Sequence, residues 1–183
     1  MLYPAPVVMV SCGDKPENYN IITIAWAANI CTNPAMTSIS IRPERHSYSI
    51  IKKTKEFVIN LTTKSLAYAT DYCGVKSGRE INKFKELKLT AAKAKHLSAP
   101  LIAESPVNIE CQVTKIIPLG SHDLFLAKVI CVHANNQYFN KSGKFDLSKT
   151  ALISYSHGNY YQLGNYLGHF GFSVRKIKKD RQR

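Results

Sequence analysis

The most constraining feature of this sequence is a strict two-residue alternation between positions 107 and 114. Four apolar residues alternate there with polar ones: Val107, Ile109, Cys111 and Val113. Successive side chains of a β-strand point to opposite faces, so this period predicts a strand with one buried face. After a turn at 118–121, residues 123–133 are apolar on both faces, as in a strand of a closed barrel or under a helix. Together the two segments predict a long hairpin.

The rest of the chain predicts further short strands with helical inserts. Apolar, β-branched runs that end at Gly, Pro or Asn turns indicate four more strands, at 7–11, 20–31, 36–42 and 56–61. Residues 44–53 and 63–72 have the spacing and termini of helices, and 74–79 is expected to be a loop. We find no internal repeat or low-complexity linker. With 183 residues and 45% apolar side chains, the chain is expected to form a single domain of the mainly β class, a β-barrel with helical inserts.

The composition of the chain limits the kinds of partner and compartment that can be expected. The net charge is +13, but residues 175–183 supply +5 of it and contain no aromatic residue that could stack on bases. We therefore expect a solvated basic tail rather than a nucleic-acid arm, and a body whose charge serves a phosphorylated cofactor or dinucleotide. The longest apolar run is too short to span a bilayer, and the N-terminus lacks a basic leader. Five widely spaced cysteines predict neither a disulfide framework nor a zinc site. The expected compartment is the cytoplasm.

Three familiar catalytic patterns are weak here. Ser121, His122 and Asp123 are consecutive, and strand neighbours point to opposite faces, so we expect no catalytic triad. The glycines at 164, 168 and 171 match neither a dinucleotide fingerprint nor a P-loop. No carboxylate pair suggests glycosidase chemistry.

The strongest candidate site is the segment 42–49, between a strand end and a helix start. It offers guanidinium groups, hydroxyls and a histidine, listed in order as Arg42, Arg45, His46, Ser47 and Ser49. Unpaired N–H groups at a helix N-terminus and arginine forks both suit a phosphate monoester. The alternative is that both arginines are surface residues that pair with Glu44 or Glu56.

The order of these segments resembles the flavin reductase-like family of FMN-binding split barrels, which includes flavoredoxin. The resemblance rests on several collinear pieces: Asn20 to Trp26, Cys31 to Ala35, Arg42 to Ser49, Glu56 to Asn60, Lys83-Phe84, Ile109 to Cys111, Gly120 to His122 and Gly164 to Gly168. Three departures stand out: Ala35 replaces a second proline, Asn82 replaces an aspartate, and Ser121 replaces the aspartate of a Gly-Asp-His turn.

The resemblance implies a set of cofactor-binding residues. FMN would lie along the strand 23–31, held mostly by backbone groups, with its phosphate at 42–49. The implied contacts on the strand are Thr23, Ala25, Trp26, Ala27, Asn29 and Cys31. Lys83 would stabilise negative charge on the reduced ring, and His122 would bind the nicotinamide substrate. The alternatives are that Trp26 is a core aromatic residue and that His122 is only a turn residue.

The implied function is hydride transfer from NADH or NADPH to N5 of FMN and onward electron transfer to an unidentified acceptor. The flavin would carry the chemistry, so no side chain is expected to be catalytic and no metal is expected. The alternatives are an FMN-binding electron carrier without its own nicotinamide reductase activity, or a basic nucleic-acid-binding barrel. A homodimer is expected. Within the domain 1–183, residues 1–153 would form the split barrel and 154–174 an ordered tail at the dimer interface or active site.

Overall fold

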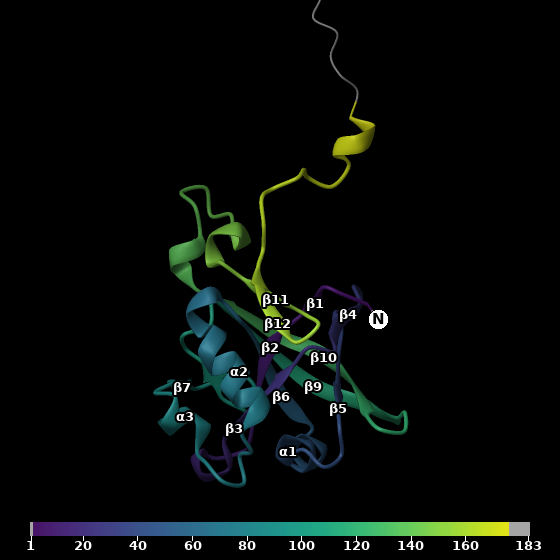
Figure 1. Cartoon of the computed structure of the whole chain (residues 1–183), viewed down its shortest axis with the longest axis vertical. Helices are drawn as coiled ribbons and strands as arrows, with labels where there is room; N and C mark the ends of the chain where they lie inside the picture. The colour runs from purple at the N-terminus through teal and green to yellow at the C-terminus, as the bar shows by residue number, and fades with distance from the viewer. Residues whose placement is uncertain (1, 176–183) are drawn as a thin grey trace, which may run out of the picture.

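The structure, a computed structural model, describes residues 2–175 and is built on one large antiparallel sheet (Figure 1). Its seven strands lie in the order β3-β2-β6-β9-β10-β5-β4. Their bounds are β2 Val8–Cys12, β3 Asn20–Ile24, β4 Ala27–Cys31, β5 Met36–Ile41, β6 Glu56–Leu61, β9 Val107–Pro118 and β10 Asp123–Ala134. The prediction of a mainly β split barrel is confirmed.

The two edge strands of this sheet are neighbours in the sequence. β3 and β4 stand at opposite ends of the strand order, yet only Ala25 and Trp26 separate them. The sheet must therefore curl until its two edges approach each other. The prediction of one continuous strand over 20–31 was wrong, because the chain changes edges at Ala25 and Trp26. The backbone N–H of Ser40 in β5 donates to the Trp26 carbonyl (2.9 Å) and fixes this crossing.

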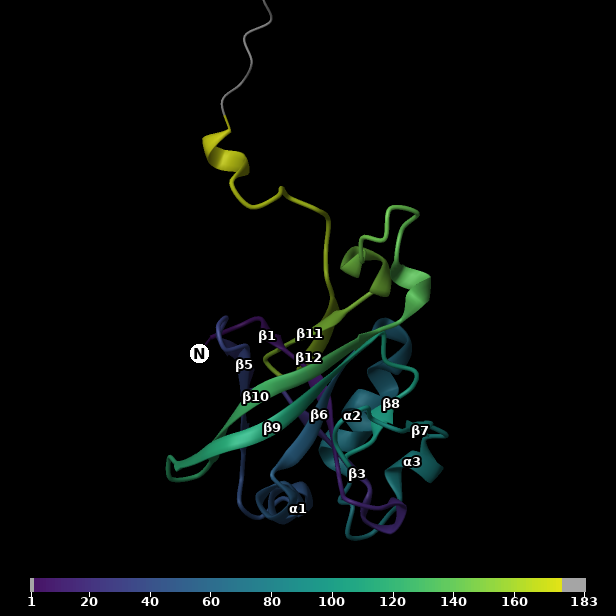
Figure 2. The ribbon, with the colours of Figure 1, turned by 180° about the vertical axis from the view of Figure 1, so that it is seen from behind.

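The long hairpin predicted from the alternation is present. β9 and β10 pair along their whole length, from Asp123 opposite Pro118 to Ala134 opposite Val107. Figure 2 shows them side by side across the back of the molecule. Register shifts at Leu126–Ala127 and Val129–Cys131 bend the pair, as β-bulges do.

The barrel is filled by apolar side chains from all of the central strands. Phe57, Ile39 and Phe125 are fully buried there, and Tyr48 and Ile51 from helix α1 (His46–Thr54) pack against the same cluster. The helix begins two residues later than predicted, because Arg45 is the N-cap and has extended backbone angles. Burying one face of α1 fixes its N-terminus at the end of β5.

A second layer covers the outer face of β2 and β3. It contains α2 (Ala67–Val75) and α3 (Lys83–Glu86), whose apolar residues pack on Met9 and Ile21. The prediction of a helix over 63–72 and a loop over 74–79 was partly wrong, because α2 continues through Gly74. At this glycine a Cβ atom would lie 3.3 Å from Thr23, so the small residue lets the helix approach β3.

The remaining elements are short. A two-stranded sheet joins β7 (Ala91–Ala92) to β8 (Leu101–Ile102). The 3-10 helices are η1 Pro16–Asn18, η2 Lys64–Leu66, η3 Asn136–Tyr138, η4 Leu147–Thr150 and η5 Phe172–Val174. Among residues 2–175, no helix is long and apolar enough to cross a bilayer. All five cysteines are free, and Cys12, Cys73 and Cys111 are buried.

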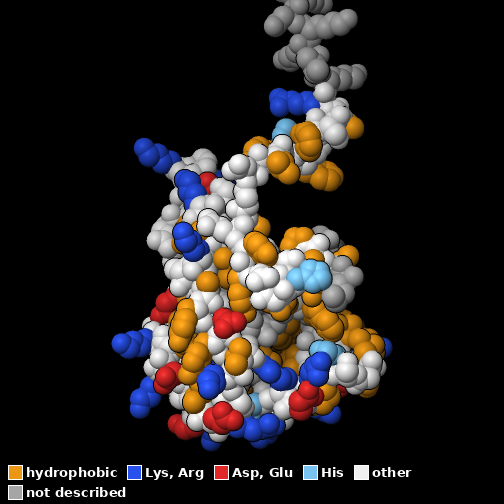
Figure 3. Space-filling model, in the orientation of Figure 1, with side chains coloured by type: hydrophobic (Ala, Val, Ile, Leu, Met, Phe, Trp, Pro, Cys, Tyr) orange, Lys and Arg blue, Asp and Glu red, His pale blue; other side chains and the backbone are white. Residues whose placement is uncertain are grey.

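The C-terminal part of the chain begins as a hairpin packed on the barrel and continues as a projecting segment. β11 (Ile153–Ser156) and β12 (Asn159–Gln162) form a hairpin that adds to β1 (Ala5–Pro6). Residues 163–174 then run away from the body and carry η5 (Figure 1). Figure 3 shows apolar side chains gathered on this projecting segment. Of the predicted tail 154–174, only the hairpin packs on the barrel, and residues 176–183 of the basic tail lie outside the described residues.

Candidate functional site

A buried lysine marks one end of the candidate site. Lys83 is the first residue of α3, and its Nζ donates to the carbonyl oxygens of Ile21 (2.6 Å) and Cys73 (2.8 Å). The Asn82 side chain caps the helix by accepting from the Lys85 N–H (3.0 Å). Burial lowers the pKa of Lys83 to about 8, and nearby Arg45 lowers it further while Cys73 opposes the shift.

Other cations surround this lysine at the N-terminus of α1. A cavity of about 210 Å³ is lined there by Asn20, Ile22, Glu44, Arg45, His46, Ser47, Val75, Lys76, Ser77, Gly78, Arg79 and Lys83. Burial lowers the pKa of His46, and Arg79 and Lys83 lower it further. We call this space the cation cavity. Burial is the main cause of both pKa shifts, and neighbouring cations add to each of them.

In the described part of the chain, Arg45, Arg79 and Lys83 of this cavity form no ion pair. Within residues 2–175 the ion pairs are Arg42–Glu44 (3.5 Å), His133–Glu110 and Lys149–Asp146 (3.6 Å). None of these includes Arg45, Arg79 or Lys83. Arg45 instead donates to the Gly74 carbonyl, which holds its guanidinium group at the cavity wall. Since the first N–H groups of a helix also lack intrahelical partners, the cavity has the chemistry of an anion site.

The wall of the cation cavity depends on one close backbone approach. A Cβ atom at Gly78 would lie 2.2 Å from Oδ1 of Asn20, so any other residue there would displace the Asn20 side chain. The Asn20 amide in turn donates to Oγ of Ser47 (2.8 Å), which is buried in the first turn of α1. Gly78 therefore sets the distance between the 76–79 loop and the helix N-terminus.

A second cavity continues from the first along β3. It has a volume of about 190 Å³ and is lined by Ile22, Thr23, Ile24, Ala25, Trp26, Ser40, Ile41, Arg42, Arg45 and His122. The two cavities share Ile22 and Arg45. We call the second one the seam cavity, because it follows the point where the chain passes from β3 to β4. Together they make a cleft with a cationic end and a long, mostly neutral end.

Two aromatic rings stand at the neutral end of this cleft. Trp26 is 57% exposed, so the alternative that it is a core aromatic residue was wrong. Its ring lies 4.7 Å from that of His122, centroid to centroid, with the planes tilted by 37°. Oγ of Ser121 lies 2.9 Å from Nδ1 of His122 and orients the imidazole. A flat ligand along β3 would end at this pair.

The structure brings most of the predicted site residues to this cleft. Nine line one or both cavities: Thr23, Ala25, Trp26, Arg42, Arg45, His46, Ser47, Lys83 and His122. Two hydroxyls are engaged within the protein: Thr23 donates to the Thr70 carbonyl and Ser49 donates to that of His46 (3.2 Å). Lys83 lies at the cationic end, away from the strand 23–26 where it was expected to act on the ring.

The other predicted residues lie outside this cleft. Ser49 lines a cavity of about 760 Å³ that shares His46, Gly78 and Arg79 with the cation cavity, and Ala27 lines an apolar cavity of about 390 Å³. Asn29 and Cys31 are exposed farther along β4 and line none of the cavities described here. Their contact with a cofactor stays a prediction.

Arg79 and Gly78 were missed by sequence reasoning. They lie in a segment that was treated only as a loop, and nothing local places it beside residues 45–47. The sequence did contain a signal for their place in the site, because Gly78 and Arg79 lie only a few residues before the Lys83-Phe84 pair that carries part of the family resemblance.

No catalytic triad forms, although the predicted reason was incomplete. Ser121 and His122 do contact each other because they lie in the turn before β10, where strand alternation does not apply. Asp123 points elsewhere. Its buried carboxylate accepts a hydrogen bond from the Tyr48 hydroxyl (2.6 Å).

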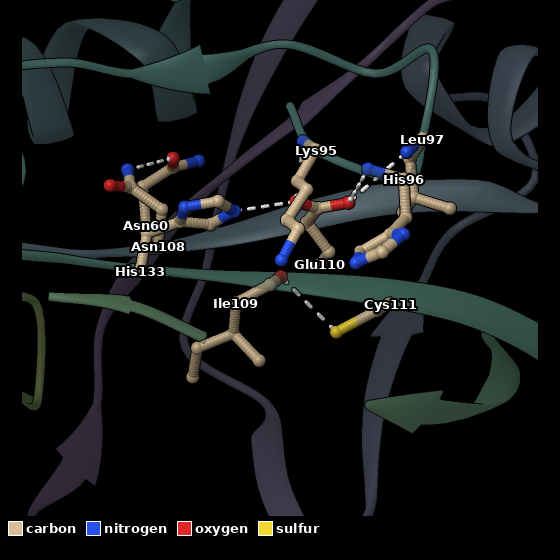
Figure 4. Close-up of polar contacts among 9 residues, drawn as sticks. All are labelled: Asn60, Lys95, His96, Leu97, Asn108, Ile109, Glu110, Cys111 and His133. Atoms are coloured by element: carbon tan, nitrogen blue, oxygen red, sulfur yellow. Dashed lines mark hydrogen bonds and ion pairs between the residues drawn. The ribbon is translucent and has the colours of Figure 1, made fainter. Parts of the chain in front are cut away.

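A second polar cluster centres on Glu110 (Figure 4). This fully buried carboxylate accepts hydrogen bonds from His133 (2.5 Å) and from the backbone N–H groups of Lys95, His96 and Leu97 (2.8–3.1 Å). Cys131 also lies within 4.8 Å of these ligand atoms, a grouping that the sequence spacing did not predict. Four donors already occupy the lone pairs of both oxygens, so we assign Glu110 the structural task of anchoring residues 95–97.

Known proteins share this sequence and architecture. A model of the flavin reductase like domain matches residues 1–164. An uncharacterised protein of Archaeoglobus fulgidus is 30% identical over 161 residues, which cover 87% of this chain and 88% of that protein. The flavoredoxin of Desulfovibrio vulgaris superposes with a TM-score of 0.88 at 26% identity, over 96% of this chain and 95% of that one.

A more distant relative carries a functional name. The FMN reductase (NADH) of Serratia proteamaculans is 20% identical over 125 residues, which cover 67% of this chain and 68% of that protein. The domain match spans the barrel, the cleft and the strands that build both. The chain therefore belongs to the flavin reductase like domain family.

Proposed function

We propose that this protein binds FMN in the cleft and reduces it with NADH or NADPH. The observation that carries the proposal is the cation cavity, where Arg45, Arg79 and Lys83 line the space at a helix N-terminus and belong to no ion pair within residues 2–175. A phosphate monoester supplies the missing negative charge, and the guanidinium forks match its oxygens. The residues present therefore fit the phosphate of FMN.

The seam cavity suits the part of FMN beyond its phosphate, which includes the flavin ring. Backbone groups of residues 23–26 would contact the polar edge of the flavin ring, and small Ala25 permits a close approach. FMN supplies the acceptor for a hydride at N5 when it is bound. The protein orients the two reactants and excludes water between them.

The nicotinamide substrate is assigned to the exposed side of the cleft. His122 and Trp26 form its rim, and their two adjacent rings offer an aromatic surface for a second flat ring. The name of the Serratia relative, an FMN reductase that uses NADH, supports this reading.

The flavoredoxin similarity favours a second candidate function. An FMN-binding electron carrier would use the same cleft without its own nicotinamide reductase activity. A nucleic-acid-binding barrel has less support, because Arg45, Arg79 and Lys83 line a cavity of about 210 Å³ rather than an open groove.

We also propose a homodimer in the cytoplasm. The segment 163–174 carries Leu167 and Phe170, which are 92% and 105% exposed, and a partner subunit would cover them. Five free cysteines suit a reducing compartment.

Purified protein tests the flavin proposal directly. It should be yellow or bind added FMN at one per chain, and a colourless preparation that takes up no FMN would end both flavin readings. Anaerobic addition of NADH or NADPH should then bleach the flavin. A yellow protein that neither nucleotide bleaches would establish the carrier instead.

A further inference from the structure

An apolar cavity adjoins the seam cavity on its far side. It has a volume of about 390 Å³ and is lined by Leu2, Tyr3, Pro4, Ala5, Pro6, Ala25, Trp26 and Ala27. Ala25 and Trp26 belong to both cavities. A molecule in the apolar cavity therefore lies next to whatever occupies the seam.

The wall of this cavity is held in place by the fold. Ala5 and Pro6 form β1, which pairs with Tyr155 and Ser154 of β11. The Tyr3 ring packs on His157, with 4.7 Å between ring centroids. The N-terminal segment is thus fixed over the crossing between β3 and β4.

The lining defines the chemistry of an occupant. None of its eight residues carries a formal charge, so a charged ligand would lose hydration without gaining a partner. Proline, tyrosine and indole faces favour flat rings. The volume lies within the usual range for small-molecule sites and is too small for a dinucleotide.

We propose that this cavity binds a small uncharged quinone as the electron acceptor of the protein. The proposal rests on flavin binding in the seam cavity, since Ala25 and Trp26 line both cavities and set the two ligands next to each other. Reduction of a quinone to its hydroquinone consumes two electrons and two protons. The reduced flavin supplies a hydride, solvent supplies the other proton, and the flavin returns to its oxidised form.

Binding can be measured by calorimetry on the full-length protein saturated with FMN. The probe is duroquinone, whose methylated ring does not add thiols such as exposed Cys31. The matched control ligand is 2,4,6-trimethylbenzoate, a ring of similar size with a negative charge. We expect one duroquinone per chain and at least tenfold weaker binding of the benzoate.

Two variants place a charge on the cavity wall. Leu2→Asp changes a residue that is 97% exposed and so leaves folding intact, and Tyr3→Asp changes the packed ring, with Tyr3→Phe as its conservative control. We expect each aspartate to weaken duroquinone binding at least tenfold. Tyr3→Phe should bind like the wild type, and FMN affinity should be the same in all variants.

The outcomes separate this proposal from the flavin proposal. Normal FMN binding without duroquinone binding would overturn the acceptor site alone, as expected if the segment 163–174 of a second copy fills the cavity. Equal binding of duroquinone and the benzoate, or binding unaffected by both aspartates, would also overturn it. Failure to bind FMN at all would remove both proposals.

Discussion

Nζ of Lys83 lies 2.6 Å from the carbonyl oxygen of Ile21, which joins the start of α3 to the middle of β3. This contact places an ammonium group inside the protein, directly behind the cleft. A lysine in this position helps to hold the second layer on the barrel and also contributes charge to the cation cavity.

The first prediction concerns the pH dependence of Lys83. Its pKa is about 8, so FMN affinity should fall as the pH rises from 7 to 9 and the ammonium group is lost. Stability without FMN should change in the opposite direction. Between about 8 and the ordinary value of 10.5 the unfolded chain binds more protons, so the free energy of unfolding rises with pH.

Flavin fluorescence titrations and urea denaturation at each pH measure these two trends. Lys83→Met should remove both, whereas Lys85→Met, an exposed lysine in the same helix, should keep them. A pH-independent FMN affinity in the wild type would show that Lys83 does not contribute to phosphate binding.

The second prediction separates the contribution of the phosphate to FMN binding from the contribution of the flavin ring. Arg45→Ala and Arg79→Ala should each weaken FMN binding about tenfold or more, because each removes a charge-assisted contact. Riboflavin, which has no phosphate, should lose much less. Fluorescence titration with both ligands gives the ratio, and exposed Arg175→Ala is the control. Equal losses for the two ligands would place the phosphate elsewhere.

The third prediction tests the close approach at Gly78. In Gly78→Ala the new methyl group displaces Asn20 from Ser47, and we expect a stability loss of about 1–3 kcal/mol. FMN affinity should fall as well, because the helix N-terminus moves. Gly164→Ala is the control, since no atom lies within 4 Å of its Cβ position. Chemical denaturation that shows equal stability for both variants would contradict this packing.

The fourth prediction concerns Glu110. Burial alone would raise its pKa, but hydrogen bonds from His133 and from the N–H groups of Lys95 and His96 lower it below the ordinary 4.5. Glu110→Gln should cost about 3 kcal/mol at pH 7, because an amide cannot accept all four hydrogen bonds.

This loss should shrink in acid. A depressed folded pKa gives stability that is present above the unfolded value and disappears as the pH falls through the folded one. Urea denaturation at pH 7 and at pH 3 measures the difference between wild type and variant. Glu104→Gln, an exposed carboxylate that accepts the Thr90 N–H, is the control and should change little.

Local sequence patterns predicted the barrel better than they predicted the cleft. The alternation at 107–113 depends only on neighbouring residues, so the β9–β10 hairpin could be read directly. The interruption between β3 and β4 at Ala25 and Trp26 could not be predicted in this way. Both residues suit a strand, and the chain turns there only because the sheet closes. Helix α2 continues through Gly74 despite the low helix propensity of glycine, because the missing side chain lets the helix pack on β3, where Thr23 donates to the Thr70 carbonyl.

The missed parts of the site depend on contacts between distant segments. Arg79 meets His46 only because α2 folds over β3, and no pattern around either residue encodes that contact. Glu110 and His133 meet diagonally, because β9 pairs with β10 next to a bulge that sets Glu110 opposite Cys131. The segment 42–49 was found because its residues are adjacent in sequence and carry their chemistry locally.

The passage of the chain from β3 to β4 at Ala25 and Trp26 determines where the barrel opens locally. The two margins of the sheet share no ladder of hydrogen bonds in the residues described, and the cleft follows the line between them. A ligand bound along that line contacts both edges of the sheet and holds them together. Among the strands of the large sheet, deuterium uptake should therefore be fastest in β3 and β4 of the empty protein and slow most in these two strands when FMN is added.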